Sequence, residues 1–366
     1  VQISYEARAY GVTKRLGSRE KAKEACPDIE LVHVDVLGPD GEKLKEVEDG
    51  LIPKPEGGGE FKVSLAPYRE ASRAWLGWLQ KAASPAIVQK ASVDEAYVDL
   101  SEVVDRATRR EEEAMGVIEM CCRLVRQGTF GEGGGEEQVK WREGEGVPNG
   151  WVLESATSLE PSRLWPLRLL VGGALVAILR ARLLRVFGFR TSAGVAPNRM
   201  LAKVVAGRHK PDKLAILTPS AVPPLLDSLS VSDLPQLGRA LGMRVVEVVG
   251  SEKLSVARRV PEGVWKEKLG AERGVWVWRR LNGADPEPVV AGIQTKSIQA
   301  SKNISPASSL DEVDPMLRLL ATEMAQRLNE DAEEHDRVAV HLVLSWKTRS
   351  GFVNKTAPLH TKAGAT

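Results

Sequence analysis

Residues 92–100 read Ser92-Val93-Asp94-Glu95-Ala96-Tyr97-Val98-Asp99-Leu100, and they place two carboxylates side by side. We predict one strand over residues 86–90 and a second over residues 95–100. In a regular strand Asp94 and Glu95 would point to opposite faces, so they can share one ion only where the backbone bends. The turn between the two predicted strands supplies such a bend.

The acidic pair has the chemistry of a divalent-cation site. Adjacent carboxylates repel each other, and burying them without compensation is costly. Mg²⁺ takes one or two protein carboxylates and completes its shell with waters and substrate phosphates. The residues alone leave a second interpretation open, in which Asp94 and Glu95 form an ordinary solvent-exposed turn.

Composition indicates a globular chain of one to three domains. The 366 residues are 43% hydrophobic and 27% charged, which allows a sizeable core. A formal net charge of +2 neither supports nor excludes nucleic acid, because basic residues can gather on one face. Cys26, Cys121 and Cys122 lack paired spacing, which argues against a disulfide framework and a zinc site. We expect a reducing compartment and find no signal peptide or membrane-spanning run.

Helices and strands alternate in the first part of the chain, which predicts an α+β or α/β domain, and a helical module follows. Predicted helices cover residues 5–10, 18–25, 68–82, 166–186, 198–206 and 315–330. Further strands are predicted over residues 32–36, 191–195 and 337–346. Residues 38–62 are rich in glycine, proline and charge and are predicted to be a surface loop, and residues 127–150 are predicted to be a disordered insert. Short helices separated by glycines are expected over residues 219–283, and a linker over residues 284–300.

Two cationic clusters suit phosphate groups. Tyr5 and Arg8 lie three residues apart, so they share one face near the start of a helix, where backbone N–H groups favour anions. An arginine fork with a tyrosine hydroxyl suits a triphosphate. Lys210 follows a predicted strand and basic helix. Each of these residues also has an ordinary interpretation, as a surface helix start or a loop lysine.

A third cluster, residues 234–239 (LPQLGR), predicts a glycine turn between two short helices. Such a turn lets backbone amides approach a DNA phosphate closely, with Arg239 beside it. Gly238 and Arg239 are therefore candidate DNA-binding residues. A packing corner between helices remains the alternative.

Taken in order, these segments resemble the motifs of Y-family DNA polymerases. Residues 92–101 are similar to the second catalytic motif, residues 5–12 to the nucleotide-binding helix, and residues 191–211 to the third palm segment. Residues 234–239 resemble the thumb hairpin, and residues 301–303 the start of the little finger. The motifs are weak singly and specific as an ordered set.

The resemblance implies translesion DNA synthesis and assigns roles to these residues. Asp94 and Glu95 would bind two Mg²⁺ ions and be catalytic. Tyr5, Arg8, Lys210 and Lys14 would contact the incoming nucleotide. Lys14 stands where one branch of the family has an arginine, and lysine keeps the charge but lacks the planar fork.

The fold implied is an α+β right-hand architecture. Its expected parts are fingers over residues 1–65, palm over 66–218, a helix-hairpin-helix-like thumb over 219–290, and a truncated little finger over 296–366. Residues 1–3 read as the end of a strand, and the family's first strand carries a further metal-binding aspartate. We therefore expect a fragment that is inactive by itself.

Partners implied by the resemblance are primer–template DNA and a deoxynucleoside triphosphate, with no membrane. A sliding clamp and ubiquitin would bind through regions outside this chain, and the nucleus is the implied location. Two alternatives stay open. One is another lesion-bypass branch of the same family, and the other is a non-catalytic DNA-binding scaffold that kept the fold.

Overall fold

The computed structural model describes residues 3–13, 19–32, 34–38, 43–44, 62–110, 113–117, 119, 151–154, 164–292, 296–304 and 306–359. The chain divides into two compact units, one of residues 1–69 with 294–366 and one of residues 70–293. Lys14, Cys121, Cys122, most of the loop predicted over residues 38–62 and all of residues 127–150 lie outside the described residues.

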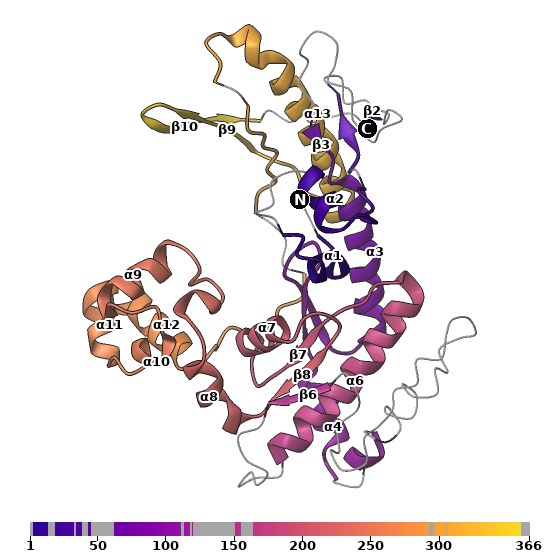
Figure 1. Ribbon diagram of the computed structural model, residues 1–366, viewed down its shortest axis with the longest axis vertical. Coiled ribbons are helices and arrows are strands. Elements are labelled where there is room, and N and C mark those ends of the chain that lie inside the picture. The colour runs from indigo at the N-terminus through magenta and orange to yellow at the C-terminus, as the bar shows by residue number, and fades with distance from the viewer. Residues whose placement is uncertain are drawn as a thin grey trace. The chain divides into compact units, whose positions relative to one another are not determined.

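The first unit begins with two short helices, α1 (Tyr5–Ala9) and α2 (Arg19–Ala25) (Figure 1). Ser4 caps α1 by accepting a hydrogen bond from the backbone N–H of Ala7, as its sequence position predicts. The strand predicted over residues 32–36 is wrong in extent. Among the described residues of this range, ladder pairing begins at Val36, and Val36 and Leu37 form β1, while Val32 is 82% exposed.

Strand β1 is the centre of a small antiparallel sheet. It pairs on one side with β2 (Lys43–Leu44) and on the other with β3 (Lys62–Val63). The long helix α13 (Leu310–His335) belongs to the same unit and starts at the N-cap Ser309. Its buried Glu323 forms ion pairs with Lys62, with Arg69 at 3.9 Å and with Arg327 at 3.5 Å. The pair with Lys62 joins residues that are 261 positions apart in the chain.

Strands β9 (His341–Thr348) and β10 (Gly351–Pro358) form a hairpin after α13. The helix is longer than the predicted range of residues 315–330, because the Ser309 cap starts it five residues earlier. The predicted strand over residues 337–346 is shifted, since pairing starts at His341. Strand β10 was not predicted.

The second unit contains a hairpin and a separate parallel sheet. Helix α3 (Ala66–Ala82) leads to β4 (Ile87–Lys90) and β5 (Ala96–Asp99), which pair antiparallel with Gln89 opposite Tyr97. The parallel sheet has the order β6–β8–β7, formed by Trp151–Glu154, Leu214–Leu217 and Ala193–Val195. Helices α6 (Leu164–Phe187) and α7 (Arg199–Arg208) pack on this sheet (Figure 1), and α4 (Ser101–Ala107) contacts α6.

Short helices follow β8 and share one apolar core with α7 and β8. They are η1 (Pro219–Ala221), α8 (Val222–Asp227), η2 (Val231–Asp233), α9 (Ala240–Val249), α10 (Leu254–Ala257), α11 (Glu262–Leu269) and α12 (Ala271–Leu281). Trp265 is fully buried in that core. The predicted all-helical composition of residues 219–283 is confirmed.

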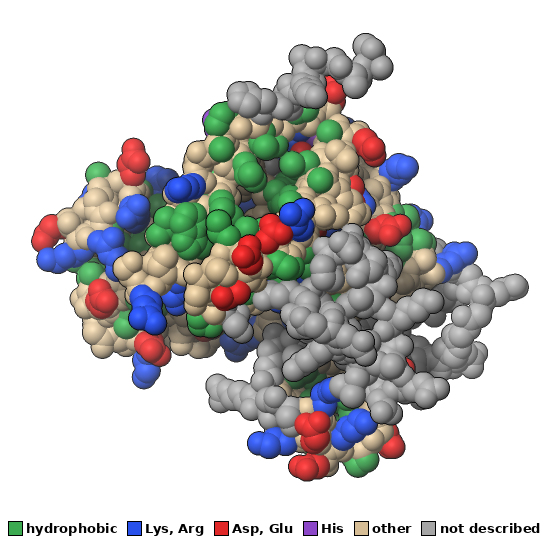
Figure 2. Space-filling model, turned by 90° about the horizontal axis from the view of Figure 1, so that it is seen from above, with side chains coloured by type: hydrophobic (Ala, Val, Ile, Leu, Met, Phe, Trp, Pro, Cys, Tyr) green, Lys and Arg blue, Asp and Glu red, His purple; other side chains and the backbone are tan. Residues whose placement is uncertain are grey.

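The surface carries charges of both signs. On the face in Figure 2, Lys and Arg side chains are interspersed with Asp and Glu side chains, in keeping with the net charge of +2. Among the described residues, no helix combines the length and the apolar character that crossing a bilayer requires.

Candidate functional site

The acidic pair lies in a closed turn between β4 and β5. The backbone N–H groups of Ala91 and Ser92 both donate to the carbonyl of Glu95, at 2.9 and 3.1 Å. The Ser92 hydroxyl donates to Asp94 Oδ1 at 2.7 Å and accepts from the Asp94 N–H at 3.2 Å. These bonds fix the backbone bend and orient the exposed Asp94 side chain.

A second element supports this turn from outside. The indole Nε1 of Trp75 in α3 donates to the carbonyl of Val93 at 3.3 Å. Val93 directly precedes the pair, so helix α3 helps to hold the turn in place. The turn is therefore a defined structure whose carboxylates still reach solvent.

Lys203 of α7 is the cation at the acidic pair. Its Nζ lies 2.8 Å from Glu95 Oε2, and both side chains are about two-fifths exposed, at 41% and 39%. The hydrogen bond to Glu95 raises the pKa of Lys203, with further contributions from the charges of Glu95, Tyr97 and Asp94 and an opposing one from burial. Lys203 thus bonds Glu95 directly, while Asp94 acts on it only through its charge.

Replacing Lys203 by glutamine is expected to lower the free energy of unfolding by less than about 1 kcal/mol at neutral pH, because a half-exposed pair is screened by water. The raised lysine pKa sets the pH range of this effect. The stabilisation is complete below the unfolded value of 10.5 and disappears as the pH rises through the higher folded value. Urea unfolding of Lys203→Gln and of the parent protein measures the difference in their free energies of unfolding, once at neutral pH and once above the folded pKa of Lys203. A difference that persists unchanged at high pH contradicts the assignment.

The donor chemistry of the turn fits a small, hard divalent cation. Two carboxylates are the protein contribution that Mg²⁺ commonly takes, with phosphate and water oxygens in its remaining positions. Within the described ranges, no three His, Cys, Asp or Glu side chains are grouped so as to hold a metal. Asp94 and Glu95 are the two carboxylates of the turn that could hold such an ion, and Glu95 would then exchange its contact with Lys203 for it.

Tyr5 and Arg8 lie together on α1, as their spacing predicts. The Arg8 guanidinium carbon is 4.5 Å from the centre of the Tyr5 ring, and its Nε donates to the carbonyl of Ile3 at 3.2 Å. Both side chains are exposed. They belong to the first unit, whereas the acidic pair belongs to the second.

Lys210 is exposed in the loop between α7 and β8, in the same unit as the acidic pair. The loop is held by Asp212, which pairs with Arg180 at 2.7 Å and with Arg190 at 3.5 Å. Arg180 is largely buried, and this burial lowers its pKa against the opposing effect of Asp212. Lys210 therefore stands on an anchored loop.

Gly238 and Arg239 are exposed at the start of α9. A Cβ on Gly238 would meet only the Ser232 carbonyl, at 3.5 Å, so the fold itself does not require glycine there. A neighbouring residue, Gly242, is packed far more tightly, because its Cβ would lie 1.6 Å from the Leu237 carbonyl oxygen. Gly242, rather than Gly238, is thus the position where the close approach of Leu237 requires a glycine.

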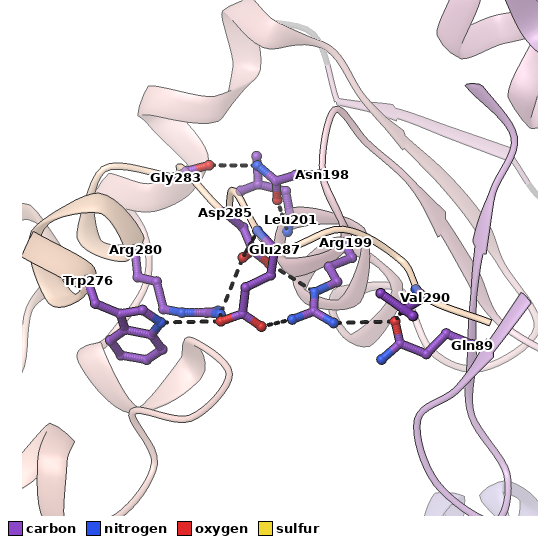
Figure 3. Close-up of polar contacts among 10 residues, drawn as sticks. All are labelled: Gln89, Asn198, Arg199, Leu201, Trp276, Arg280, Gly283, Asp285, Glu287 and Val290. Carbon is purple, nitrogen blue, oxygen red and sulfur yellow. Dashed lines mark hydrogen bonds and ion pairs between the residues drawn. The ribbon is translucent and has the colours of Figure 1, made fainter. Parts of the chain in front are cut away.

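Sequence reasoning missed two features beside the candidate site. Lys203 lies four residues after Arg199, so both are on one side of α7, and this spacing is the signal that could have identified it. The acidic residues Asp285 and Glu287 were assigned to a linker. They pair with Arg199 and Arg280 in the network of Figure 3.

Comparison with known proteins gives a consistent result. The model of the impB/mucB/samB family matches residues 1–207. The chain is 29% identical to DNA polymerase eta of Arabidopsis thaliana over 99% of this chain and 48% of that protein. It is 27% identical to DNA polymerase eta of Drosophila melanogaster, over 94% of this chain and 37% of the relative. DNA polymerase iota of Mus musculus is 26% identical over 91% of this chain and 38% of its own length. The chain thus spans less than half the length of these relatives.

Proposed function

Because this chain belongs to the impB/mucB/samB family of Y-family polymerases, we propose that the whole protein synthesises DNA on a template and copies past damaged bases. The observation that carries the proposal is the turn over residues 91–95. It holds two adjacent carboxylates at a solvent-accessible edge, beside the ammonium group of Lys203.

The reaction proposed is nucleotidyl transfer. The 3′-hydroxyl oxygen of the primer attacks the α-phosphorus of a deoxynucleoside triphosphate and its proton passes to solvent. A new P–O bond forms, the bond between the α-phosphorus and the oxygen that bridges to the β-phosphorus breaks, and pyrophosphate leaves with the electrons of that bond. Asp94 and Glu95 would hold two Mg²⁺ ions, which lower the pKa of the attacking hydroxyl and neutralise charge on the phosphates when bound.

The cationic residues of the chain would bind the triphosphate. Arg8 supplies a planar fork and Tyr5 a hydroxyl, and their contact on α1 presents both to one anion. Lys210 adds a point charge from its anchored loop, and Lys14 is proposed as a further contact. Lys203 would keep the acidic pair oriented before the substrate arrives, because it already bonds Glu95.

The proposed architecture is the right hand of the family. Residues 1–65 would form the fingers, residues 66–218 the palm, residues 219–290 the thumb and residues 296–366 part of the little finger. The uninterrupted run of short helices from Pro219 to Leu281 supports the thumb range, although these helices share their core with α7 and β8. Gly238 and Arg239 would bind DNA phosphates there, through backbone N–H groups and a guanidinium.

Primer extension by the whole protein tests the function. We expect incorporation of single nucleotides with Mg²⁺ on an undamaged template, and two adenines opposite a linked thymine pair. Extension that stops at the lesion would favour another branch, of the iota or kappa kind. Binding of primer–template DNA without any synthesis, under conditions where the protein is folded, would favour the scaffold.

We propose further that the 366-residue chain alone does not synthesise DNA. Among its described residues the acidic turn offers two carboxylates without a third ligand nearby, whereas a two-metal site clamps both the attacking and the leaving oxygen. A sliding clamp and ubiquitin are proposed partners of the whole protein, and the nucleus its location.

A further inference from the structure

Arg199, the first residue of α7, connects the β4–β5 hairpin, here called the acidic hairpin, with the segment that follows α12 (Figure 3). Its guanidinium donates to Gln89 Oε1 of β4 at 3.4 Å and lies 5.7 Å from the Tyr97 ring of β5. The same group pairs with Asp285 at 3.4 Å and forms a hydrogen-bonded ion pair with Glu287. One side chain thus touches both strands of the hairpin and two carboxylates far along the chain.

A second arginine balances the charges in this cluster. Arg280 of α12 contacts Asp285 at 3.4 Å and Glu287 at 3.1 Å. The side chains of Arg280 and Asp285 are only 4% and 1% exposed, so each charge depends on its partners. Trp276 Nε1 also donates to Glu287 at 3.3 Å. Two cations and two anions make the cluster electrically neutral.

Backbone bonds fix the rest of the segment over residues 283–290. Gln89 Oε1 accepts a second hydrogen bond from the Val290 N–H at 3.0 Å. At the other end, the Asn198 amide nitrogen donates to the Gly283 carbonyl at 2.8 Å, while its oxygen caps α7 through the Leu201 N–H at 2.9 Å. This segment is therefore a tightly held strap along α7 and β4.

Helix α7 holds the hairpin at two points. Arg199 contacts the register pair Gln89 and Tyr97, and Lys203, one turn later, bonds Glu95. Tyr97 is two residues from Glu95. We propose that Arg199 is a positioning residue, which fixes the hairpin and its acidic pair against α7 and the strap. Its effect on catalysis rests on the function proposed above.

The competing view is that the cluster only adds stability, as buried ion networks can. The two views differ in what happens to molecules that remain folded. A stabilising role changes the midpoint of unfolding and leaves the turnover of folded protein unchanged. A positioning role also changes turnover and the local mobility of the hairpin. A small displacement of reacting groups can lower a rate by up to about 100-fold.

Arg199→Ala, Arg199→Lys and Gln89→Met in the whole protein test the proposal. Gln89→Met leaves all four charges in place and removes the β4 oxygen that accepts hydrogen bonds from Arg199 and from the Val290 N–H. We expect kcat to fall about 10- to 100-fold in Arg199→Ala and about 3- to 10-fold in Gln89→Met, with KM for the nucleotide within about 3-fold. Arg199→Lys should regain stability but keep a kcat deficit, because a compact ammonium lacks the planar fork with which the guanidinium reaches Gln89, Asp285 and Glu287 through separate nitrogens.

Arg168→Ala is the matched control, since it removes an arginine that pairs α6 with Asp105 of α4 in the same unit. It should lower the unfolding midpoint and leave kcat of the folded protein unchanged. Unaltered kcat in both Arg199→Lys and Gln89→Met would overturn the proposal, even if Arg199→Ala fails to fold.

Hydrogen exchange gives a readout that does not depend on synthesis. The amides of residues 87–99 should exchange faster in the Arg199 and Gln89 variants and at the parent rate in Arg168→Ala. Unchanged exchange in all variants would refute the positioning role. Absence of synthesis by the parent protein would refute the proposed function and leave the exchange result to decide on Arg199.

Discussion

Asp94→Asn and Glu95→Gln in the whole protein are each expected to lower kcat for nucleotide incorporation by about 1,000-fold or more. Each change keeps the size of the side chain and removes one negative charge. Metal-assisted stabilisation of a phosphoryl transition state amounts to several kcal/mol, and each 1.36 kcal/mol corresponds to about tenfold in rate. Single-turnover primer extension at saturating nucleotide measures the loss directly.

Asp99→Asn is the matched control for this prediction. Asp99 lies on the same strand, β5, and its carboxylate accepts a hydrogen bond from the Ser101 N–H at 2.9 Å. An asparagine oxygen can accept the same bond, so activity should stay within about 3-fold of the parent. Equal losses at positions 94 and 99 would point to a general effect on β5. Full activity in Asp94→Asn and Glu95→Gln would contradict the proposed catalytic role of the pair.

The predicted hairpin over residues 86–100 agrees with the structure because its signals are local. Its two strands pair as β4 and β5, and the acidic turn between them is closed by bonds within residues 91–95. The cap at Ser4 is equally local. Both features are formed by residues that are close in the sequence, so a local sequence pattern is enough to predict them.

The parts that were missed depend on residues distant in the chain. Glu95 and Lys203 are 108 residues apart, and Gln89 and Val290 are 201 apart. No local pattern marks residues 283–290 as a strap, because their composition is that of a linker. Strand β8 also escaped prediction. Its fully buried residues form one uninterrupted apolar run, which lacks the alternation that identifies a half-exposed strand.

A further prediction concerns the contact between β7 and α7, on which both Lys203 and Arg199 depend. A Cβ on Gly194 would lie 2.1 Å from the Ala202 carbonyl oxygen, 2.7 Å from Val205 Cγ1 and 2.8 Å from the Ala206 nitrogen. Two of these atoms belong to the helix backbone, so no side-chain rotation can make room. Gly194→Ala therefore requires α7 to move away from the sheet.

Gly194→Ala is accordingly expected to lower the free energy of unfolding by about 3 kcal/mol or more, the upper range for overpacking. Gly207→Ala, the same substitution later in α7, serves as control. A Cβ there meets nothing within 4 Å, and alanine favours the helix by up to about 1 kcal/mol. Urea unfolding followed by circular dichroism should thus give opposite signs for the two variants. Equal stability of Gly194→Ala and Gly207→Ala would show that α7 does not pack against β7 as closely as described. The proposal that Arg199 and Lys203 of α7 position the β4–β5 hairpin would then lose its support.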